Sequence, residues 1–412
     1  MATLNLKQLG KLGLLASLYI SQLIPLAFLG QALPVYLRQQ GASLRTIGLF
    51  ALMGLPFVLK FLWAPLIDRY GFTRWGHYRF WIICFQLLAA GGTAACAFVG
   101  AQGGFMPLLL CLLLLCFVCA SQDVATDALA IGLLDPQERG LGNGVQAAGN
   151  YLGIIIGGGG MLLLLDRWGW TWTVLAMAAM MLVALLPVLN HREQCKPKVE
   201  KQNGLSLRGY LKALTQLFRR PGMRKWLLLM IGYLAGPNLV LAMFRPLLVD
   251  MGLSLTEIGL LLGVVSSTAG IVGALSSGFV VAALGRKRSL VVFGVLRAIA
   301  LCAYLLPAFG MTNLSLIYLI VIAFQFAASM ANTTLYTIMM DKSQPETAGT
   351  DYTLQNSVVG LSVDGVSIIS GVLADALGYG GAFAIGVAIA FLGVGLVATA
   401  LPRQQLALAK QP

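Results

Sequence analysis

Twelve apolar stretches follow one another along this chain, and their length limits what it can fold into. A helix needs about 20 consecutive apolar residues to cross a lipid bilayer. Charged residues make up only 10% of the sequence, whereas a soluble domain carries about 25%, and the apolar excess extends over the whole chain. We therefore predict an all-α polytopic membrane protein. The predicted spans are residues 10–37, 44–67, 78–99, 105–133, 139–165, 168–189, 224–249, 255–284, 289–309, 313–340, 346–376 and 379–402.

Two similar octapeptides, 211 positions apart, indicate that one membrane module occurs twice in the chain. Residues 41–48 read GASLRTIG and residues 252–259 read GLSLTEIG, and each octapeptide leads into an apolar stretch. A short basic loop follows that stretch in both copies, at 68–79 and at 285–288. Six spans return each copy to the same side of the membrane. Parallel halves of this kind predict the major facilitator fold, with twelve transmembrane helices in two six-helix pseudo-symmetric halves.

A long polar stretch with two prolines and three glycines follows the sixth predicted span and separates the two halves. We predict an N-terminal six-helix bundle at residues 1–190, a cytoplasmic linker at 191–223 and a C-terminal six-helix bundle at 224–412. If both termini are cytoplasmic, 22 of the 28 Lys and Arg residues fall on the cytoplasmic side and three fall outside. This positive-inside pattern predicts that orientation. It also explains the net charge of +13 without nucleic acid as a partner.

Ionisable residues inside the predicted spans are candidate functional groups, because each costs about 2.5–3.5 kcal/mol on insertion scales. Lys60 lies eight residues before Asp68, roughly 12 Å from the predicted cytoplasmic end of its span. Asp123 and Asp127 are four residues apart, so a helix places them on the same face. Pairing of Lys60 with one of them lowers the cost of burying both. The group is then either a static ion pair or a site that couples transport to protons.

The tight basic loops that end the second and eighth spans are predicted to clamp the cytoplasmic gate of an outward-open state. Their acidic and basic residues join the buried charges as candidates for coupling and gating. These candidates are Lys60, Asp68, Arg69, Asp123, Asp127 and Arg286.

Arg297 stands alone in the ninth span, and Asp364 lies in the middle of the eleventh. The two side chains could neutralise each other, or Arg297 could meet an anionic substrate. Aromatic and amide side chains in several spans would line a cavity for a bulky, polar, partly aromatic ligand. Aromatic residues near span ends are also typical of the membrane interface. The substrate-binding candidates are Tyr19, Gln22, Phe28, Tyr233, Asn238, Arg297, Gln325, Tyr336, Tyr352, Gln355 and Asp364.

Signatures of an enzyme or a metal centre are missing from the sequence. The two histidines, His77 and His191, lie in separate predicted loops and cannot form a metal cluster. No Walker A motif is present, so the chain has no ATP motor of its own. A membrane acyltransferase, which is an alternative class, would need a His-based catalytic set. We predict no catalytic residues, no metal site and no cofactor, with protons as the coupling ion, and we expect a monomer.

Two segments of the first half resemble the AmpG-like branch of the major facilitator superfamily. They are residues 60–69, which read KFLWAPLIDR, and residues 121–128, which read SQDVATDA. The branch includes muropeptide permeases, acetyl-CoA transporters and siderophore permeases. Residues 348–355, which read AGTDYTLQ, are similar to the RhtX/FptX-type siderophore permeases.

This resemblance implies a proton-driven importer in the inner (cytoplasmic) membrane of a Gram-negative bacterium, working by rocking of two six-helix bundles. The implied small-molecule substrate is a ferric siderophore such as ferric pyochelin, with iron present only as part of that substrate. Import of an anhydromuropeptide is the alternative within the same branch. A membrane sensor that binds such a ligand without moving it is the alternative from another class.

Overall fold

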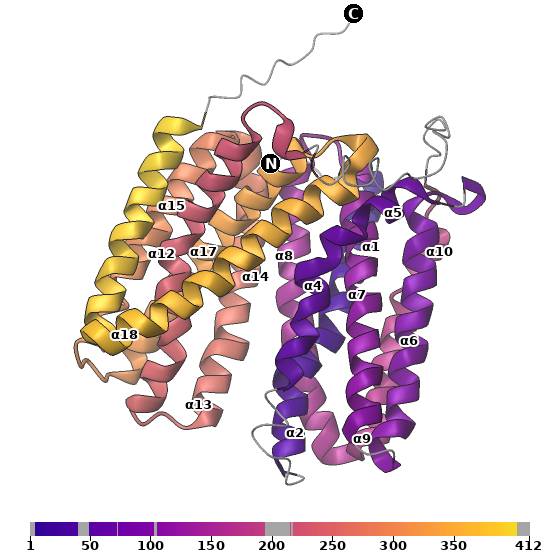
Figure 1. The fold of residues 1–412 in the computed structure, drawn as a ribbon, viewed down its shortest axis with the longest axis horizontal. Coiled ribbons are helices and arrows are strands. Elements are labelled where there is room, and N and C mark those ends of the chain that lie inside the picture. The colour runs from indigo at the N-terminus through magenta and orange to yellow at the C-terminus, as the bar shows by residue number, and fades with distance from the viewer. Residues whose placement is uncertain are drawn as a thin grey trace, which may run out of the picture. The chain divides into compact units, whose positions relative to one another are not determined.

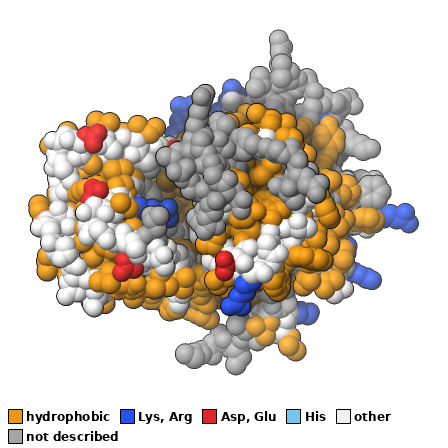
Figure 2. Space-filling view, turned by 90° about the horizontal axis from the view of Figure 1, so that it is seen from below, with side chains coloured by type: hydrophobic (Ala, Val, Ile, Leu, Met, Phe, Trp, Pro, Cys, Tyr) orange, Lys and Arg blue, Asp and Glu red, His pale blue; other side chains and the backbone are white. Residues whose placement is uncertain are grey.

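The computed structural model describes residues 5–39, 49–71, 73–102, 105–193, 215 and 217–401. All regular structure in this part of the chain is helical, and nine of its helices are long and apolar enough to cross a membrane (Figure 1). Hydrophobic side chains and uncharged polar or backbone atoms cover the visible surface of the described residues, with only scattered charges among them (Figure 2). The predicted all-α, multi-pass class is therefore confirmed.

Two glycines explain why nine long helices correspond to more than nine spans. Gly169 and Gly378 have φ values of 72° and 69°, in a region that favours glycine. Each breaks a run of residues that otherwise forms one continuous helix, so each run contains two spans. With these two divisions and the broken segment described next, the helices of the described residues match the twelve predicted spans.

The second predicted span is a series of short helical pieces instead of one helix. A 3₁₀ segment at Leu49–Gly54 leads into α4 (Leu55–Leu59), a 3₁₀ turn at Lys60–Leu62 follows, and α5 (Ala64–Arg69) completes the span. Proline lies at the start of both α4 and α5, at positions 56 and 65. Proline has no N–H to donate to the preceding turn, so the sequence interrupts the helix on both sides of Lys60.

The chain divides into two compact units by its internal contacts. One unit contains Met1–Arg219 together with Met339–Ser357, and the other contains Arg220–Ile338 together with Val358–Pro412. The segment Met339–Ser357, which we call the corner, joins α17 to α18 and packs with the first unit. The predicted domain ranges, which follow the polar linker, remain a prediction. The helices of the first unit are α1 (Leu6–Ala27), α2 (Leu33–Gln39), α4, α5, α6 (Tyr78–Gln102), α7 (Phe105–Leu133), α8 (Arg139–Ile155), α9 (Met161–Val183) and α10 (Leu186–Asn190).

Within the first unit, α8 packs on α1, and α6 packs on both α7 and α9. Glycine permits the closest of these approaches, because a Cβ atom added at Gly157 would lie 2.2 Å from the carbonyl oxygen of Ile24. Gly149, two turns earlier on α8, faces Tyr19, and a Cβ atom added at Gly149 would lie 3.3 Å from the Cβ atom of Tyr19. The glycines therefore bring the polar side chains of α1 and α8 close to each other.

The second unit has its own apolar core, in which Phe244, Tyr304 and Phe324 pack edge to face. The second of the two similar octapeptides, residues 252–259, lies in this unit and begins α13. It forms a capping box, in which the side chains of Ser254 and Glu257 each accept a hydrogen bond from the other residue's backbone N–H group. The first octapeptide lies outside the described residues. The helices of this unit are α12 (Met223–Asp250), α13 (Leu255–Gly259), α14 (Ser266–Leu284), α15 (Arg286–Cys302), α16 (Leu305–Ala308), α17 (Leu314–Lys342) and α18 (Ala348–Ala400), the last two shared with the corner.

Candidate functional site

A buried ion pair joins the broken second span to α7. Lys60 is only 3% exposed, and its ammonium group contacts a carboxylate oxygen of Asp123. The 3₁₀ turn between the two prolines points the lysine side chain at α7. An isolated ammonium group would be very costly at this depth, and the carboxylate partly offsets that cost. The structure thus pairs Lys60 with Asp123, the first of the two aspartates that the sequence singled out.

Asp127, one turn further along α7, has a different environment. It is 1% exposed, and one carboxylate oxygen, Oδ1, accepts hydrogen bonds from the hydroxyl of Tyr19 at 2.8 Å and from Nε2 of Gln146 at 3.3 Å. The other oxygen, Oδ2, is buried and has no hydrogen-bond partner among the described residues. Asp127 is therefore held by α1 and α8 and forms no ion pair with Lys60, which contacts Asp123.

Three acceptor atoms on α1 and α8, the helices that hold Asp127, also have no hydrogen-bond partner among the described residues. They are Oε1 of Gln146, Oδ1 of Asn150 and Oε1 of Gln22, all buried. Gln146 cannot be turned over to remove its unpaired oxygen, because its nitrogen must face the carboxylate of Asp127. A buried acceptor without a donor is costly. Burial also favours the neutral form of a carboxyl group, so a proton on the unpaired oxygen of Asp127 would lower the cost of burying it.

A chain of amide side chains fixes the rotation of α7. Gln22 donates to the hydroxyl of Thr126 at 2.7 Å, and that hydroxyl donates to the backbone carbonyl of Gln122 at 3.0 Å. The side chain of Gln122 in turn donates to Gln86 on α6, and Gln86 donates to the carbonyl of Met181 at 2.7 Å. The sequence predictions did not include Gln86, Gln122 or Thr126 as site residues. The sequence feature that could have identified them is the presence of amide and hydroxyl side chains inside apolar spans, where polar groups are unusual and costly.

Asp68, at the end of the second span, caps the N-terminus of α18. It accepts hydrogen bonds from the backbone N–H of Gly349 at 2.9 Å and of Thr350 at 2.7 Å, and from the hydroxyl of Tyr78 at 2.9 Å. Burial raises the pKa of Asp68, although these hydrogen bonds act in the opposite direction. A Cβ atom at position 349 would lie 2.6 Å from the carboxylate, so glycine is needed for this approach. A carboxylate here also meets the positive end of the helix dipole.

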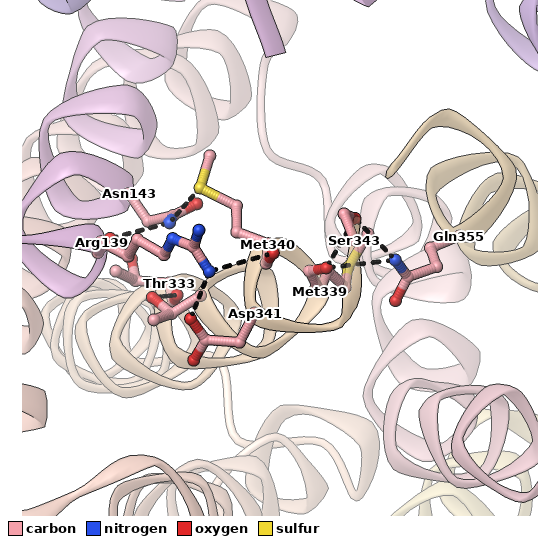
Figure 3. A network of polar contacts seen from close by, with 9 residues as sticks. Arg139, Asn143, Thr333, Met339, Met340, Asp341, Ser343 and Gln355 are labelled. Atoms are coloured by element: carbon pink, nitrogen blue, oxygen red, sulfur yellow. Dashed lines mark hydrogen bonds and ion pairs between the residues drawn. The ribbon is translucent and has the colours of Figure 1, made fainter. Parts of the chain in front are cut away.

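Further contacts hold the corner against the first unit (Figure 3). Arg139, at the start of α8, forms an ion pair with Asp341 at 2.9 Å, and the amide nitrogen of Asn143 lies 3.0 Å from Sδ of Met340. Gln355 donates to the carbonyl of Met339 at 3.1 Å and to Ser343 at 3.2 Å. The amide nitrogen of Gln355, a predicted substrate contact, is thus used within the corner itself.

The second unit contains a buried guanidinium group without an acidic partner. Arg297 is 2% exposed, donates to the carbonyl of Tyr233 at 2.7 Å and to Oδ1 of Asn332 at 3.4 Å, and lies 4.2 Å above the Tyr233 ring centroid. Stacking on the ring adds a cation–π contribution. Among the described residues no carboxylate forms an ion pair with Arg297, and Asp364 is exposed. The mutual neutralisation of Arg297 and Asp364 is therefore not seen.

The other predicted residues have more varied positions. Phe28 belongs to the apolar core, with its ring centroid 6.0 Å from that of Trp170. Asn238 is half-buried and donates to Leu234 in its own helix at 2.8 Å. Their predicted roles, like those of every site residue, remain predictions. Arg69 is exposed at the end of α5, Arg286 is half-buried at the start of α15, Gln325 and Tyr336 are half-buried on α17, and Tyr352 is buried near the start of α18.

Long apolar helices that bury paired and unpaired charges are the features of a polytopic membrane protein. Residues 15–363 match the family described as the Major Facilitator Superfamily. The chain belongs to this family, whose members are transporters, and the prediction that it is not an enzyme is confirmed.

Two relatives connect the chain to AmpG-type permeases. It is 28% identical over 379 residues to the "Anhydromuropeptide permease" of Escherichia coli (strain K12), an alignment that covers 90% of this chain and 76% of the relative. It is 24% identical over 371 residues to "Putative transporter AmpG 4" of Rickettsia conorii, covering 87% of this chain and 89% of the relative. These similarities support the resemblance to the AmpG-like branch.

Two solved structures share the fold. The human organic anion transporter MFSD10 aligns with a TM-score of 0.70 at 17% identity and covers 95% of this chain and 98% of its own. The Escherichia coli fucose:proton symporter aligns with a TM-score of 0.69 at 15% identity and covers 94% and 98% respectively. At these identities the similarity establishes the fold alone.

Proposed function

We propose that this protein is a proton-driven secondary transporter that imports an anhydromuropeptide-like molecule across the bacterial inner membrane by alternating access. The observation that carries the proposal is Asp127, a buried carboxyl group that has one unpaired oxygen and no ion pair within the described parts of the chain. A static structural charge would be expected to have all its hydrogen bonds satisfied. An exchangeable proton on that oxygen would account for its environment.

The side chain of Lys60 would move when Asp127 loses its proton, and this movement would link the proton to the conformation of the protein. In the protonated state Asp127 is neutral and Lys60 pairs with Asp123. Loss of the proton creates a second carboxylate one turn away on the same face of α7. The ammonium group is then attracted to both aspartates, and movement of Lys60 toward Asp127 would convert a proton transfer into a rearrangement of the broken second span. Both termini would lie in the cytoplasm in this proposal.

The similarity to an anhydromuropeptide permease favours the alternative substrate that the sequence left open over a ferric siderophore. The chemistry of the two buried clusters supports the same choice. Unpaired acceptors on α1 and α8 suit the hydroxyl and amide N–H donors of an amino sugar and a peptide. The unpaired Nε of Arg297 suits a peptide carboxylate. Import of a ferric siderophore stays a prediction from the sequence.

The proposal is tested by uptake of radiolabelled anhydromuropeptide into spheroplasts that contain the protein, with ferric pyochelin measured in parallel. We expect accumulation of the muropeptide, and we expect an uncoupler to abolish it. Accumulation of ferric pyochelin alone would replace the proposed substrate with the siderophore. Binding without any uptake of either compound would instead identify a sensor.

The coupling step is tested by Asp127→Asn. The amide keeps the size of the side chain but cannot exchange a proton. We expect this variant to lose accumulation against a gradient and to retain counterflow exchange of labelled for unlabelled substrate. Accumulation at the wild-type level would contradict a coupling role for Asp127.

A further inference from the structure

A groove lies on the exposed surface of α9, and none of the buried charged residues described above lines it. It has a volume of about 700 Å³ and is lined by Arg167, Trp168, Trp172, Leu175, Ala176 and Ala179. It lies where Gly169 breaks the helix between two membrane spans, so it begins at the end of a span and runs along the apolar part of the next.

The residues of the groove follow helical spacing. Trp172, Ala176 and Ala179 are separated by four and three residues, so they form one stripe on α9. The small side chains of Ala176 and Ala179 leave room for the groove, and Trp168 and Trp172 line the part of it near Arg167. Trp168 and Trp172 are 56% and 68% exposed, which is a large apolar surface. Tryptophan at the end of a span is typical of the membrane–water interface.

A positive charge lies at the same end of the groove. Arg167 is exposed, and within the described parts of the chain no carboxylate lies within ion-pair distance of it, although Asp166 precedes it in sequence. The groove therefore has a guanidinium group at its interfacial end and an apolar channel toward the membrane interior. Guanidinium binds phosphate oxygens through paired N–H donors.

We infer that this groove binds one anionic phospholipid, with the phosphate group at Arg167 and an acyl chain along the Ala176–Ala179 stripe. The charge and the apolar channel occur in the order in which a phospholipid presents its headgroup and its tail. A peptide from the aqueous phase would expose unpaired backbone groups in the apolar part, which is costly in a bilayer. The inference does not depend on the transported substrate.

The test is native mass spectrometry of the full chain, purified in mixed micelles that contain equal amounts of phosphatidylglycerol and of a diacylglycerol with the same acyl chains, which has no phosphate group. We expect wild-type protein to retain one phosphatidylglycerol, with about tenfold preference, as a charge-assisted hydrogen bond provides. Arg167→Gln should remove the preference, and Ala179→Phe should remove the bound lipid by filling the groove. Val372→Phe, on an exposed position of α18 in the other unit, is the matched control and should retain the lipid.

Three results would overturn the inference. Equal retention of phosphatidylglycerol by Arg167→Gln would show that Arg167 does not recognise the phosphate. Unchanged retention by an Ala179→Phe variant that elutes as a single species would place the lipid elsewhere. A dimer of the wild-type chain that Ala179→Phe dissociates would make the groove an interface between two copies of the protein.

Discussion

The carboxylate of Asp68 accepts hydrogen bonds from both the backbone N–H and the hydroxyl of Thr350, 282 positions along the chain, each at 2.7 Å. One aspartate of the first basic loop thus caps the N-terminus of α18, a run of 53 residues that is the longest among the described helices. Helix capping by a side chain contributes about 0.5–2 kcal/mol. The second basic loop, which begins at Gly285, has no aspartate in the corresponding position.

We therefore expect Asp68→Asn to lower the Tm of the purified protein and to reduce the rate of uptake. Asparagine has one acceptor oxygen in place of two, so it cannot satisfy the N–H groups of both Gly349 and Thr350 together with the Tyr78 hydroxyl. Asp166→Asn, at an exposed aspartate, is the control and should leave Tm unchanged. Equal Tm values for Asp68→Asn and wild type would show that the cap contributes nothing measurable.

A double-mutant cycle should show that Lys60 and Asp123 are energetically coupled. Removing one partner of a fully buried pair costs about 3–5 kcal/mol, and we expect a somewhat smaller effect because Asp123 keeps some exposure. Lys60→Met alone should destabilise the protein strongly, and Lys60→Met combined with Asp123→Asn should recover much of that loss. Thermal unfolding measures both. Additive effects of the two substitutions would mean that the pair is not energetically coupled.

Glu138 should make stability depend on pH. Burial alone would raise the pKa of Glu138, but hydrogen bonds from Lys11 at 2.7 Å, from the Asp135 backbone and from Gln8 outweigh burial and lower it. A lowered pKa in the folded state means that the stabilisation is present above the ordinary value of 4.5 and disappears as the pH falls through the folded value. The contribution is below about 1 kcal/mol, because the ion pair is only partly buried and solvent screens it.

The measurement is Tm between pH 7 and pH 3 for wild type and Glu138→Gln. The difference between the two proteins should be constant near neutral pH and should shrink below pH 4.5. A difference that stays constant down to pH 3 would assign the effect of the substitution to hydrogen bonding by the amide and not to the charge.

Arg297 is expected to act on substrate binding as well as on packing. Arg297→Lys keeps the charge but loses the planar group that stacks on Tyr233 and bonds to its carbonyl. We expect the apparent KM for a carboxylated substrate to rise about tenfold, the usual effect of losing one charge-assisted hydrogen bond. Arg245→Lys, at an exposed arginine on α12, is the control. A lower Tm with unchanged KM would limit Arg297 to a structural role.

Hydropathy predicted the number of helices because bilayer thickness sets their length, and local spacing predicted that Asp123 and Asp127 share a face. The breaks around Lys60 were also readable, since proline at positions 56 and 65 interrupts a helix. The predicted uninterrupted span at 44–67 gave too little weight to those prolines. Helix bounds therefore need residue chemistry in addition to hydropathy.

Partners far apart in sequence could not be predicted in this way. Nothing local assigns Asp68 to Thr350, or Gln122 to Gln86, because those contacts depend on how helices pack. The same limit applies to Lys60, which could have paired with either aspartate by spacing alone. The unpaired oxygen of Asp127 became visible only once the neighbours on α1 and α8 were in place.

The interrupted second span has a consequence for how quickly the protein can work. Lys60 lies on a three-residue turn between short helical pieces, so few backbone hydrogen bonds have to open for its ammonium group to move by one helical turn. In an uninterrupted helix the same displacement would require unwinding against a cooperative ladder. The two prolines thus remove helical hydrogen bonds that would otherwise have to break during each cycle. A variant that restores a regular helix there should make this segment more rigid and the transport cycle slower.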